Sequence, residues 1–95
     1  MIESEKALEI ALHLEIRKLG GWTLKLLPFQ VSGLPDRVCL LPRGRLFFAE
    51  IKTTKKDPSR RQRYVHSKLR LLGFRVEVID RSVQIEELIK EYTKE

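Results

Sequence analysis

Residues 37–52 read RVCLLPRGRLFFAEIK, in which two apolar runs flank a turn at residues 42–44. Apolar runs of this length, separated by proline and glycine, are typical of two strands that form a hairpin. We expect strands over residues 37–41 and 45–52. Both runs are almost continuously apolar, which is typical of strands that are covered on two faces.

The sequence on either side of this hairpin predicts further helices and strands. They are a helix over residues 3–19 closed by Gly20-Gly21, a strand over 22–29, a helix capped by Asp57-Pro58 that ends at Gly73, a strand over 74–79, and a last helix that Ser82 can cap. The resulting order, αβββαβα, predicts an α/β fold in which a mixed sheet is flanked by helices.

The composition predicts one small globular domain over residues 1–95. Hydrophobic residues make up 42% of the chain and charged residues 34%, which excludes a disordered chain. No apolar run approaches the roughly 18 residues of a membrane span, and the acidic N-terminal sequence is unlike a signal peptide. The single cysteine, Cys39, cannot form an internal disulfide and is expected to be a small buried residue. We therefore expect a protein of a reducing, cytoplasmic compartment without membrane contacts.

The net charge of the chain is +6, and basic residues are concentrated in one segment. Between residues 52 and 63 a single acid, Asp57, stands against Lys52, Lys55, Lys56, Arg60, Arg61 and Arg63. Such a cluster is typical of contacts with a phosphate backbone, but a solvated loop and helix face has the same composition. Charge alone leaves both interpretations open.

Charged residues also stand at the ends of the predicted hairpin strands. Asp36 precedes the first strand in the stretch GLPDR, and Glu50 and Lys52 end the second strand. Successive side chains alternate faces along a strand, so Glu50 and Lys52 point the same way as Leu46 and Phe48. Burying both charges is costly unless they form a salt bridge with each other or bind a ligand.

Polar residues on the apolar faces of the predicted helices point to the same kind of site. Glu5 lies in one stripe with Leu8 and Leu12, although an acid in the first turn of a helix can simply be a favourable partner of the helix dipole. Gln62 lies on the same side of its helix as Val65, where it could satisfy a buried backbone group or form part of a polar site.

Acids that converge on one point need a cation. Asp36 and Glu50 are hard oxygen ligands of the kind that Mg²⁺ or Mn²⁺ prefers, and Glu5 could complete the set from the helix. A metal held there could activate water and polarise a phosphoryl oxygen, and Lys52 could orient the attacking water or neutralise charge on the phosphate. Hydrolysis of a phosphodiester is the reaction that these groups predict.

Asp36 followed by Glu50-Ile51-Lys52 resembles the core of the PD-(D/E)xK nucleases, in which the acids bind metal and the lysine assists attack. More narrowly, residues 5–79 resemble the stand-alone VRR-NUC domains of phages and bacteria. The matching segments are Glu5 in the first helix, GLPDR at 33–37, FAEIK at 48–52, SRRQ at 59–62 and GFRV at 73–76. The resemblance implies a restriction-endonuclease-like fold and metal-dependent cleavage of DNA.

The resemblance also implies which residues act, and on what. The active-site positions of the family are occupied by Glu5, Asp36, Glu50, Lys52 and Gln62, and the implied metal ligands are Glu5, Asp36, Glu50 and the backbone carbonyl of Ile51. The expected DNA contacts are Lys25, Arg37, Lys55, Lys56, Arg60, Arg61 and Arg63. The stand-alone members imply a homodimer that acts on branched DNA such as four-way junctions, in the cytoplasm of a bacterium or a phage-infected cell.

Two other functions stay open at this point. A nucleic-acid-binding module that does not cleave would carry the same basic cluster, with Glu50 and Lys52 as a structural pair. An archaeal-type junction resolvase shares the acid and lysine core, although Gln62 in its SRRQ setting favours the phage-type family.

The first predicted helix carries a second apolar strip, formed by Ala7, Ile10, Ala11 and Leu14. Either a second copy of the protein or the last helix of the same chain could cover this strip. Trp22 is expected in the core. His13 and His66 are expected on solvated helix surfaces, where neither would be a catalyst.

Overall fold

The computed structural model describes residues 3–27, 31–53 and 58–94. In chain order the elements are α1 (Glu5–Lys18), β1 (Trp22–Lys25), β2 (Arg37–Leu41), a 3₁₀ turn (Pro42–Gly44), β3 (Arg45–Ile51), α2 (Arg60–Leu71), β4 (Val76–Ile79) and α3 (Ser82–Thr93). This is the predicted order, αβββαβα, and the mixed α/β fold is confirmed. Among the described residues, no helix is long and apolar enough to cross a membrane.

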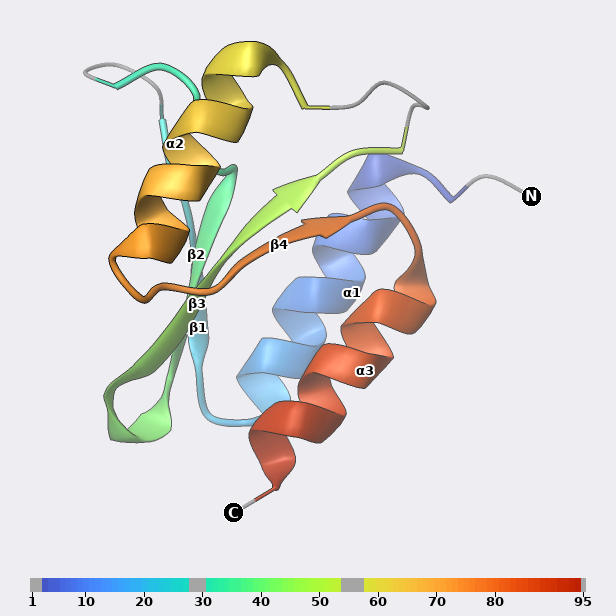
Figure 1. Cartoon of the computed structure of the whole chain (residues 1–95). Helices are drawn as coiled ribbons and strands as arrows, with labels where there is room; N and C mark the ends of the chain where they lie inside the picture. The colour runs from blue at the N-terminus through green and yellow to red at the C-terminus, as the bar shows by residue number, and fades with distance from the viewer. Residues whose placement is uncertain (1–2, 28–30, 54–57, 95) are drawn as a thin grey trace.

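One four-stranded sheet, in the order β1-β2-β3-β4, holds the molecule together (Figure 1). Strands β1, β2 and β3 pair antiparallel, whereas β4 pairs parallel with β3 and places Val78 opposite Glu50. A parallel pair needs a crossover connection, and α2 lies within that connection. The site-bearing end of β3 therefore lies between the hairpin partner β2 on one side and β4 on the other.

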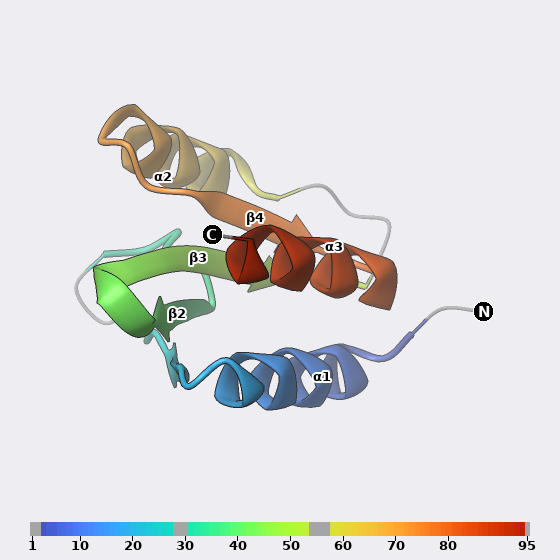
Figure 2. The ribbon, with the colours of Figure 1, turned by 90° about the horizontal axis from the view of Figure 1, so that it is seen from below.

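Helices cover both faces of the sheet. Figure 2 shows α1 and α3 together on one side and α2 on the other. The core lies on the side of α1 and α3, and its buried members are Leu8, Leu12, Ile16, Cys39, Leu41, Phe47, Ala49, Ile51, Ile79, Ile85 and Leu88. Alternate residues of β3 enter this core, so the intervening ones, Glu50 included, point to the side of α2.

The ends of several elements differ from the sequence prediction. Strand β1 stops at Lys25 and not at residue 29, and residues 28 and 29 lie outside the described part of the chain. The predicted cap of α2 is wrong, because the N-cap is Ser59 and Pro58 precedes it, while Asp57 is outside the described residues. Strand β4 begins at Val76 and not at residue 74.

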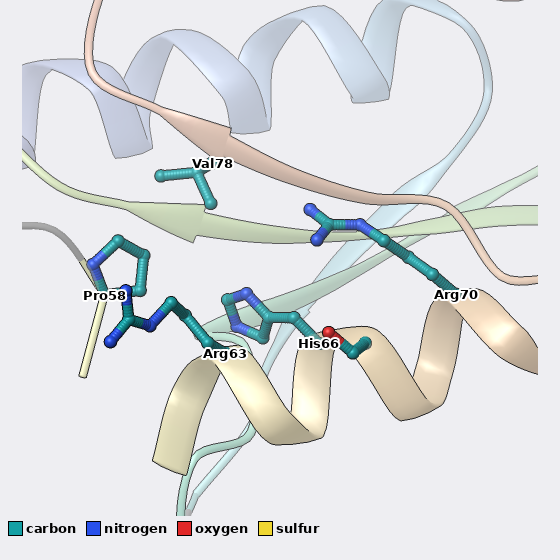
Figure 3. Close-up of a pocket in the computed structure, with 6 residues that line it drawn as sticks. Pro58, Arg63, His66, Arg70 and Val78 are labelled. Carbon is teal, nitrogen blue, oxygen red and sulfur yellow. The ribbon is translucent and has the colours of Figure 1, made fainter. Parts of the chain in front are cut away.

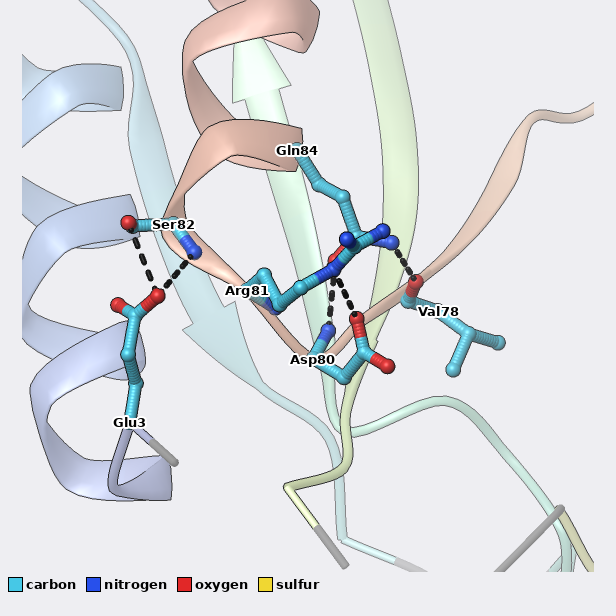
Figure 4. A network of polar contacts seen from close by, with 6 residues as sticks. All are labelled: Glu3, Val78, Asp80, Arg81, Ser82 and Gln84. Carbon is cyan, nitrogen blue, oxygen red and sulfur yellow. Dashed lines mark hydrogen bonds and ion pairs between the residues drawn. The ribbon is translucent and has the colours of Figure 1, made fainter. Parts of the chain in front are cut away.

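Ser82 was expected to cap α3, but it is the first helical residue and Arg81 is the N-cap. The Ser82 backbone N–H and hydroxyl both donate to Oε1 of Glu3, at 2.9 and 3.0 Å (Figure 4). On the other side of the turn, Oε1 of Gln84 accepts the backbone N–H groups of Asp80 and Arg81, and the bond to Asp80 can be followed in Figure 4. The start of α1 is thus bound to the segment that follows β4, at the end of the sheet where β3 also ends.

Burial of three other residues contradicts or refines the prediction. Trp22 is 61% exposed instead of lying in the core, because it pairs with Leu40 on a sheet face that α2 covers only in part. His66 is 2% exposed and not on a solvated surface, because it lies on the face of α2 that packs against the sheet. His13 is half-buried, and its Nδ1 lies 3.0 Å from the Thr23 hydroxyl.

Candidate active site

Two carboxylates are held together where the hairpin ends. One oxygen of Glu50, Oε1, accepts the backbone N–H of Asp36 at 3.2 Å. In return, Oδ2 of Asp36 accepts the backbone N–H of Ile51 at 3.1 Å. The register of β2 and β3 sets Arg37 opposite Ala49, so the next step along the hairpin brings Asp36 to Glu50. Glu50 therefore binds the backbone of Asp36, and Asp36 binds the backbone of the residue after Glu50, so the hairpin itself fixes their relative position.

Lys52 and Gln62 complete the surroundings of Glu50. The second Glu50 oxygen, Oε2, accepts a hydrogen bond from Nε2 of Gln62 at 3.1 Å, and Nζ of Lys52 lies 3.9 Å from the same oxygen. The lysine contact is at the outer limit of an ion pair. A simple Glu50–Lys52 salt bridge therefore does not account for the burial of Glu50, because its oxygens are bound mainly by Asp36 and Gln62.

The electrostatics of Glu50 favour a bound cation. Burial, together with the neighbouring Asp36 carboxylate, raises the pKa of Glu50 to about 7, although Lys52 and the two hydrogen bonds act in the opposite direction. Ionising Glu50 beside Asp36 thus costs free energy in the protein alone. A divalent ion would remove that cost, and two adjacent carboxylates are oxygen donors that suit Mg²⁺ or Mn²⁺.

Gln62 is positioned by the first turn of α2. Its backbone N–H donates to Oγ of Ser59 at 3.1 Å, and its side-chain Oε1 accepts the backbone N–H of Ser59 at 2.9 Å, which makes a capping box. The amide nitrogen that remains is the group that donates to Glu50. One glutamine thus joins the helix cap to the acid pair.

The loop before Asp36 packs directly against this turn of the helix. Gly33 has a φ of +86°, and a Cβ at this position would lie 2.8 Å from the carbonyl oxygen of Arg61. Nε of Arg61 in turn donates to the carbonyl and hydroxyl oxygens of Ser32, at 3.2 and 3.1 Å. Only glycine fits this backbone and this contact. The glycine in GLPDR therefore serves the approach of the loop to α2, beside Asp36.

A cavity of about 470 Å³ opens between this loop and α2. Asp36 and Gln62 line it together with Leu26, Ser32, Gly33, Leu34, Ser59 and Arg61. Asp36, one member of the acid pair, is thus reachable from this side of α2.

Glu5 lies apart from this pair. It is exposed in the first turn of α1, and the described residues contain no group of three or more His, Cys, Asp or Glu side chains that could hold a metal. Two contacts nevertheless put the start of α1 at this end of the sheet. Glu3 binds Ser82 after β4, and Oε2 of Glu9 pairs with Arg37, the residue next to Asp36, at 3.3 Å. The structure brings Asp36, Glu50, Ile51, Lys52 and Gln62 together, but not Glu5.

The basic residues expected to contact DNA are distributed over several surfaces. Arg60 and Arg63 are exposed on α2, and Lys25 is exposed at the end of β1. Arg37 is half-buried in its pair with Glu9, and Arg61 holds Ser32. Lys55 and Lys56 lie outside the described residues. The exposed arginines of α2 are the basic groups that flank Gln62 most directly.

Sequence reasoning missed His66 as part of this region, and it used Ser59 only as part of the SRRQ motif and not as the cap of α2. His66 follows Gln62 by four residues, the spacing of side chains on one helix face, and this spacing was the signal that could have placed it beside the site. Ser59 begins the Ser-x-x-Gln pattern of a capping box, which marks a helix start more specifically than Asp57-Pro58 does.

Known proteins share both this fold and this sequence. A solved structure described as a VRR_NUC domain superposes with a TM-score of 0.85 at 31% sequence identity, and the match covers 93% of this chain and 96% of that one. A protein of Acyrthosiphon pisum secondary endosymbiont phage 1, named "Putative nuclease p44", is 37% identical over 76 residues, which are 80% of this chain and 82% of the phage protein. No family model matches the chain. On these two likenesses, and as its sequence motifs predicted, the chain belongs to the VRR_NUC domain family of PD-(D/E)xK nucleases.

Proposed function

We propose that this nuclease is a divalent-metal-dependent DNA endonuclease that hydrolyses phosphodiester bonds, with branched DNA such as four-way junctions as its substrate. The observation that carries the proposal is the mutual binding of Asp36 and Glu50, with Lys52 and Gln62 on the second oxygen of Glu50. Family membership supports nuclease activity. The cytoplasm is the location we propose for it.

Asp36, Glu50 and the backbone carbonyl of Ile51 would hold an Mg²⁺ or Mn²⁺ ion, and Glu5 would join them from the first turn of α1. The raised pKa of Glu50 supports this assignment, since a cation is what allows both acids to be ionised together. The ion would supply Lewis-acid polarisation of a phosphoryl oxygen and neutralise the charge that develops on it. Glu5 is exposed and lies apart from the pair, so it would have to move toward Asp36 and Glu50 to take part.

The chain's own residues would position the reactants. The ammonium of Lys52 is about a quarter exposed and can reach a phosphate oxygen or the attacking water while it stays close to Glu50. Gln62 holds the Glu50 carboxylate in one orientation, since both ends of its amide are bound. Arg60 and Arg63 would contact the DNA backbone from the exposed side of α2. Lys25 would do so from the edge strand.

A homodimer would place two such sites in one particle. Ile10 and Leu14 of the outer strip of α1 are 51% and 50% exposed, so α3 leaves them uncovered within the chain, although Ala11 packs against the core. A second copy of the chain is the partner we propose for this strip. Two sites related by a two-fold axis suit paired cuts in a symmetric junction.

The test is cleavage of labelled four-way-junction, flap and linear duplex DNA with Mg²⁺ or Mn²⁺. We expect cleavage of branched DNA by the wild type and a loss of at least about a hundredfold in the Asp36→Ala and Lys52→Ala proteins, because each removes a group used in the transition state. Lys90→Ala, an exposed lysine on α3, is the control and should cut normally. Equal cutting by all four proteins would contradict the assignment.

The same proteins separate this proposal from a module that only binds nucleic acid. A nuclease site binds Mn²⁺ in calorimetry, and Asp36→Ala removes that binding. Glu5→Ala should weaken it, whereas Glu15→Ala, which removes another acid of the same helix, should not. A pure binder would show DNA binding without a metal site that depends on these acids.

A further inference from the structure

A second cavity, of about 440 Å³, lies between α2 and β4 on the other side of Gln62. Figure 3 shows the basic side chains of Arg63, His66 and Arg70 gathered at this cavity, below strand β4. Its lining residues are Pro58, Arg63, His66, Ser67, Arg70 and Val78. Two guanidinium groups, an imidazole and a hydroxyl thus converge on one space, and none of the described residues that line it is an acid.

His66 leaves a polar atom of this cavity without a partner. The residue is 2% exposed, and its Nε2 has no hydrogen-bond partner among the described residues. A buried nitrogen without a partner costs on the order of 1–3 kcal/mol, so such an atom needs an explanation. Burial and the neighbouring Arg70 lower the pKa of His66, which keeps the ring neutral near pH 7. With its proton on Nε2, the ring offers one hydrogen-bond donor to a ligand in the cavity.

Among the described residues, the two arginines also have no carboxylate partner. Nη2 of Arg70 donates to the carbonyl oxygen of Val76 at 2.7 Å, which fixes the guanidinium at the rim and leaves its other N–H groups for a ligand. Neither Arg63 nor Arg70 forms an ion pair with a carboxylate in the part of the chain that the structure describes. Guanidinium groups and a hydroxyl match the oxygens of a phosphate in charge and geometry.

The cavity lies next to the acid pair both across the sheet, from β3 to β4, and along α2. Val78 of its lining is the register partner of Glu50, and neighbouring strands lie about 4.8 Å apart. His66 follows Gln62 by one helical turn, about 6 Å along α2. Neighbouring phosphates of a DNA strand lie farther apart than its axial rise of about 3.4 Å per nucleotide, so a phosphate in this cavity would be within one to two nucleotides of a phosphate at Glu50.

We infer that this cavity, the Arg63–His66–Arg70 pocket, binds a backbone phosphate of the DNA strand one to two nucleotides from the scissile bond. The inference rests on the proposed function for its ligand, but the pocket is formed by residues outside the acid pair. Holding that phosphate fixes the register of the strand, because the scissile bond must then lie over Asp36 and Glu50. The pocket is therefore a positioning site for the substrate.

The first test uses charge-neutral phosphates. Junction DNA is made with a single methylphosphonate at each of the first three phosphates on either side of the cut, and cleavage rates are measured for wild type, Arg63→Gln and Lys68→Gln. Arg63 is exposed, so its substitution leaves the fold intact, and Lys68 is an exposed residue of the same helix outside the pocket. We expect one methylphosphonate position to slow the wild type and Lys68→Gln about tenfold but to have little further effect on Arg63→Gln.

The second test needs no cleavage. Binding of uncleaved junction DNA to the Asp36→Ala protein is measured as a function of salt, with and without Arg63→Gln. Loss of one phosphate contact should reduce the slope of log K against log salt by about 1. If the wild type never cuts junction DNA but the Asp36→Ala protein shows this change in salt slope, the proposed function fails while the phosphate contact of the pocket stands.

The third measurement identifies the ligand. The imidazole nitrogen signals of His66 should shift in NMR spectra when junction DNA is added to the Asp36→Ala protein. A shift with inorganic phosphate alone, and none with DNA, would show a site for the free ion and would overturn the inference. Equal effects of every methylphosphonate on wild type and Arg63→Gln, with an unchanged salt slope, would overturn it as well.

Discussion

At the scale of single residues, the buried Glu50 carboxylate stands out because its ionisation opposes folding. Its oxygens are bound by Asp36 and Gln62, yet burial and the Asp36 charge raise its pKa from 4.5 to about 7. The raised pKa means that the folded state holds the Glu50 proton more tightly than the unfolded state does. Protonated Glu50 therefore contributes its full stabilisation of the folded state below about pH 4.5, and this contribution is lost as the pH rises through about 7.

Glu50→Gln should remove the part of the fall in unfolding free energy that comes from the ionisation of Glu50. In the presence of a chelator, we expect the unfolding free energy of the wild type to fall by on the order of 3 kcal/mol between pH 4.5 and 8, and the Glu50→Gln protein to lack that part of the fall. Urea unfolding at a series of pH values measures both proteins. His66 titrates in both, so its contribution cancels in the difference. Parallel pH profiles would contradict the raised pKa of Glu50.

Cys39 gives a simpler prediction at the same scale. Its side chain is fully buried, and burial raises the pKa of the thiol to about 12. Because the thiolate is the reactive form, native protein at pH 8 should resist iodoacetamide, while protein in denaturant should be alkylated within minutes. Mass spectrometry of timed samples measures the difference. Equal rates in the two states would show that Cys39 is accessible.

At the scale of elements, the first turn of α2 connects helix stability with the site. Ser59 and Gln62 cap each other, and the same Gln62 side chain binds Glu50. Neither the cap nor the position of Glu50 is independent of the other. Ser59 is hydrogen-bonded to Gln62 and not to Asp36 or Glu50, so a change in Ser59 should reach the acid pair through the glutamine.

Ser59→Ala should lower the unfolding free energy by about 1 kcal/mol, the usual cost of a lost N-cap. Because it also frees Gln62, nuclease activity should fall several-fold at temperatures where the protein is fully folded. Ser59→Thr keeps a capping hydroxyl and should restore both properties. Denaturant unfolding and junction cleavage measure the two effects. Full activity in a destabilised Ser59→Ala protein would show that the helix cap does not affect the active site, and would contradict this prediction.

The hairpin was the part of the fold that sequence patterns predicted best. Strand β2 has the predicted bounds, 37–41, and β3 ends one residue before the predicted 52. Turn residues and continuous apolar runs are local signals, so they are readable without the rest of the chain. Exposure is a property of the assembled layers. Trp22 and His66 were therefore placed wrongly, since hydrophobicity alone does not show which part of a sheet face a helix covers.

The candidate site shows the same limit. The predicted acids Asp36 and Glu50 meet because the hairpin register brings them together, and Gln62 reaches them from α2. The position of Glu5 depends on how α1 lies across the whole sheet, which no local pattern gives. The Arg63–His66–Arg70 pocket depends on the crossover that brings α2 over β4, so the sequence predicted Arg63 as a DNA contact and His66 on a solvated helix surface without indicating a shared pocket.

At the scale of the whole molecule, the exposed strip of α1 predicts the oligomeric state. We expect light scattering after gel filtration to give twice the 11.2 kDa of one chain. Ile10→Lys combined with Leu14→Lys should yield a monomer, because both side chains are about half exposed in the single chain and apolar. Glu86→Lys, an exposed change on α3, should leave the dimer intact. A monomeric wild type at micromolar concentration would contradict the dimer.

The double role of Gln62 has a consequence for heat inactivation. The opening turns of helices fray at temperatures well below the melting of a core, and this particular turn carries the amide that orients Glu50. Loss of enzymatic competence on warming should therefore precede global denaturation and should be fully reversible on cooling. The activity would then depend on temperature through the reversible folding of the first turn of α2.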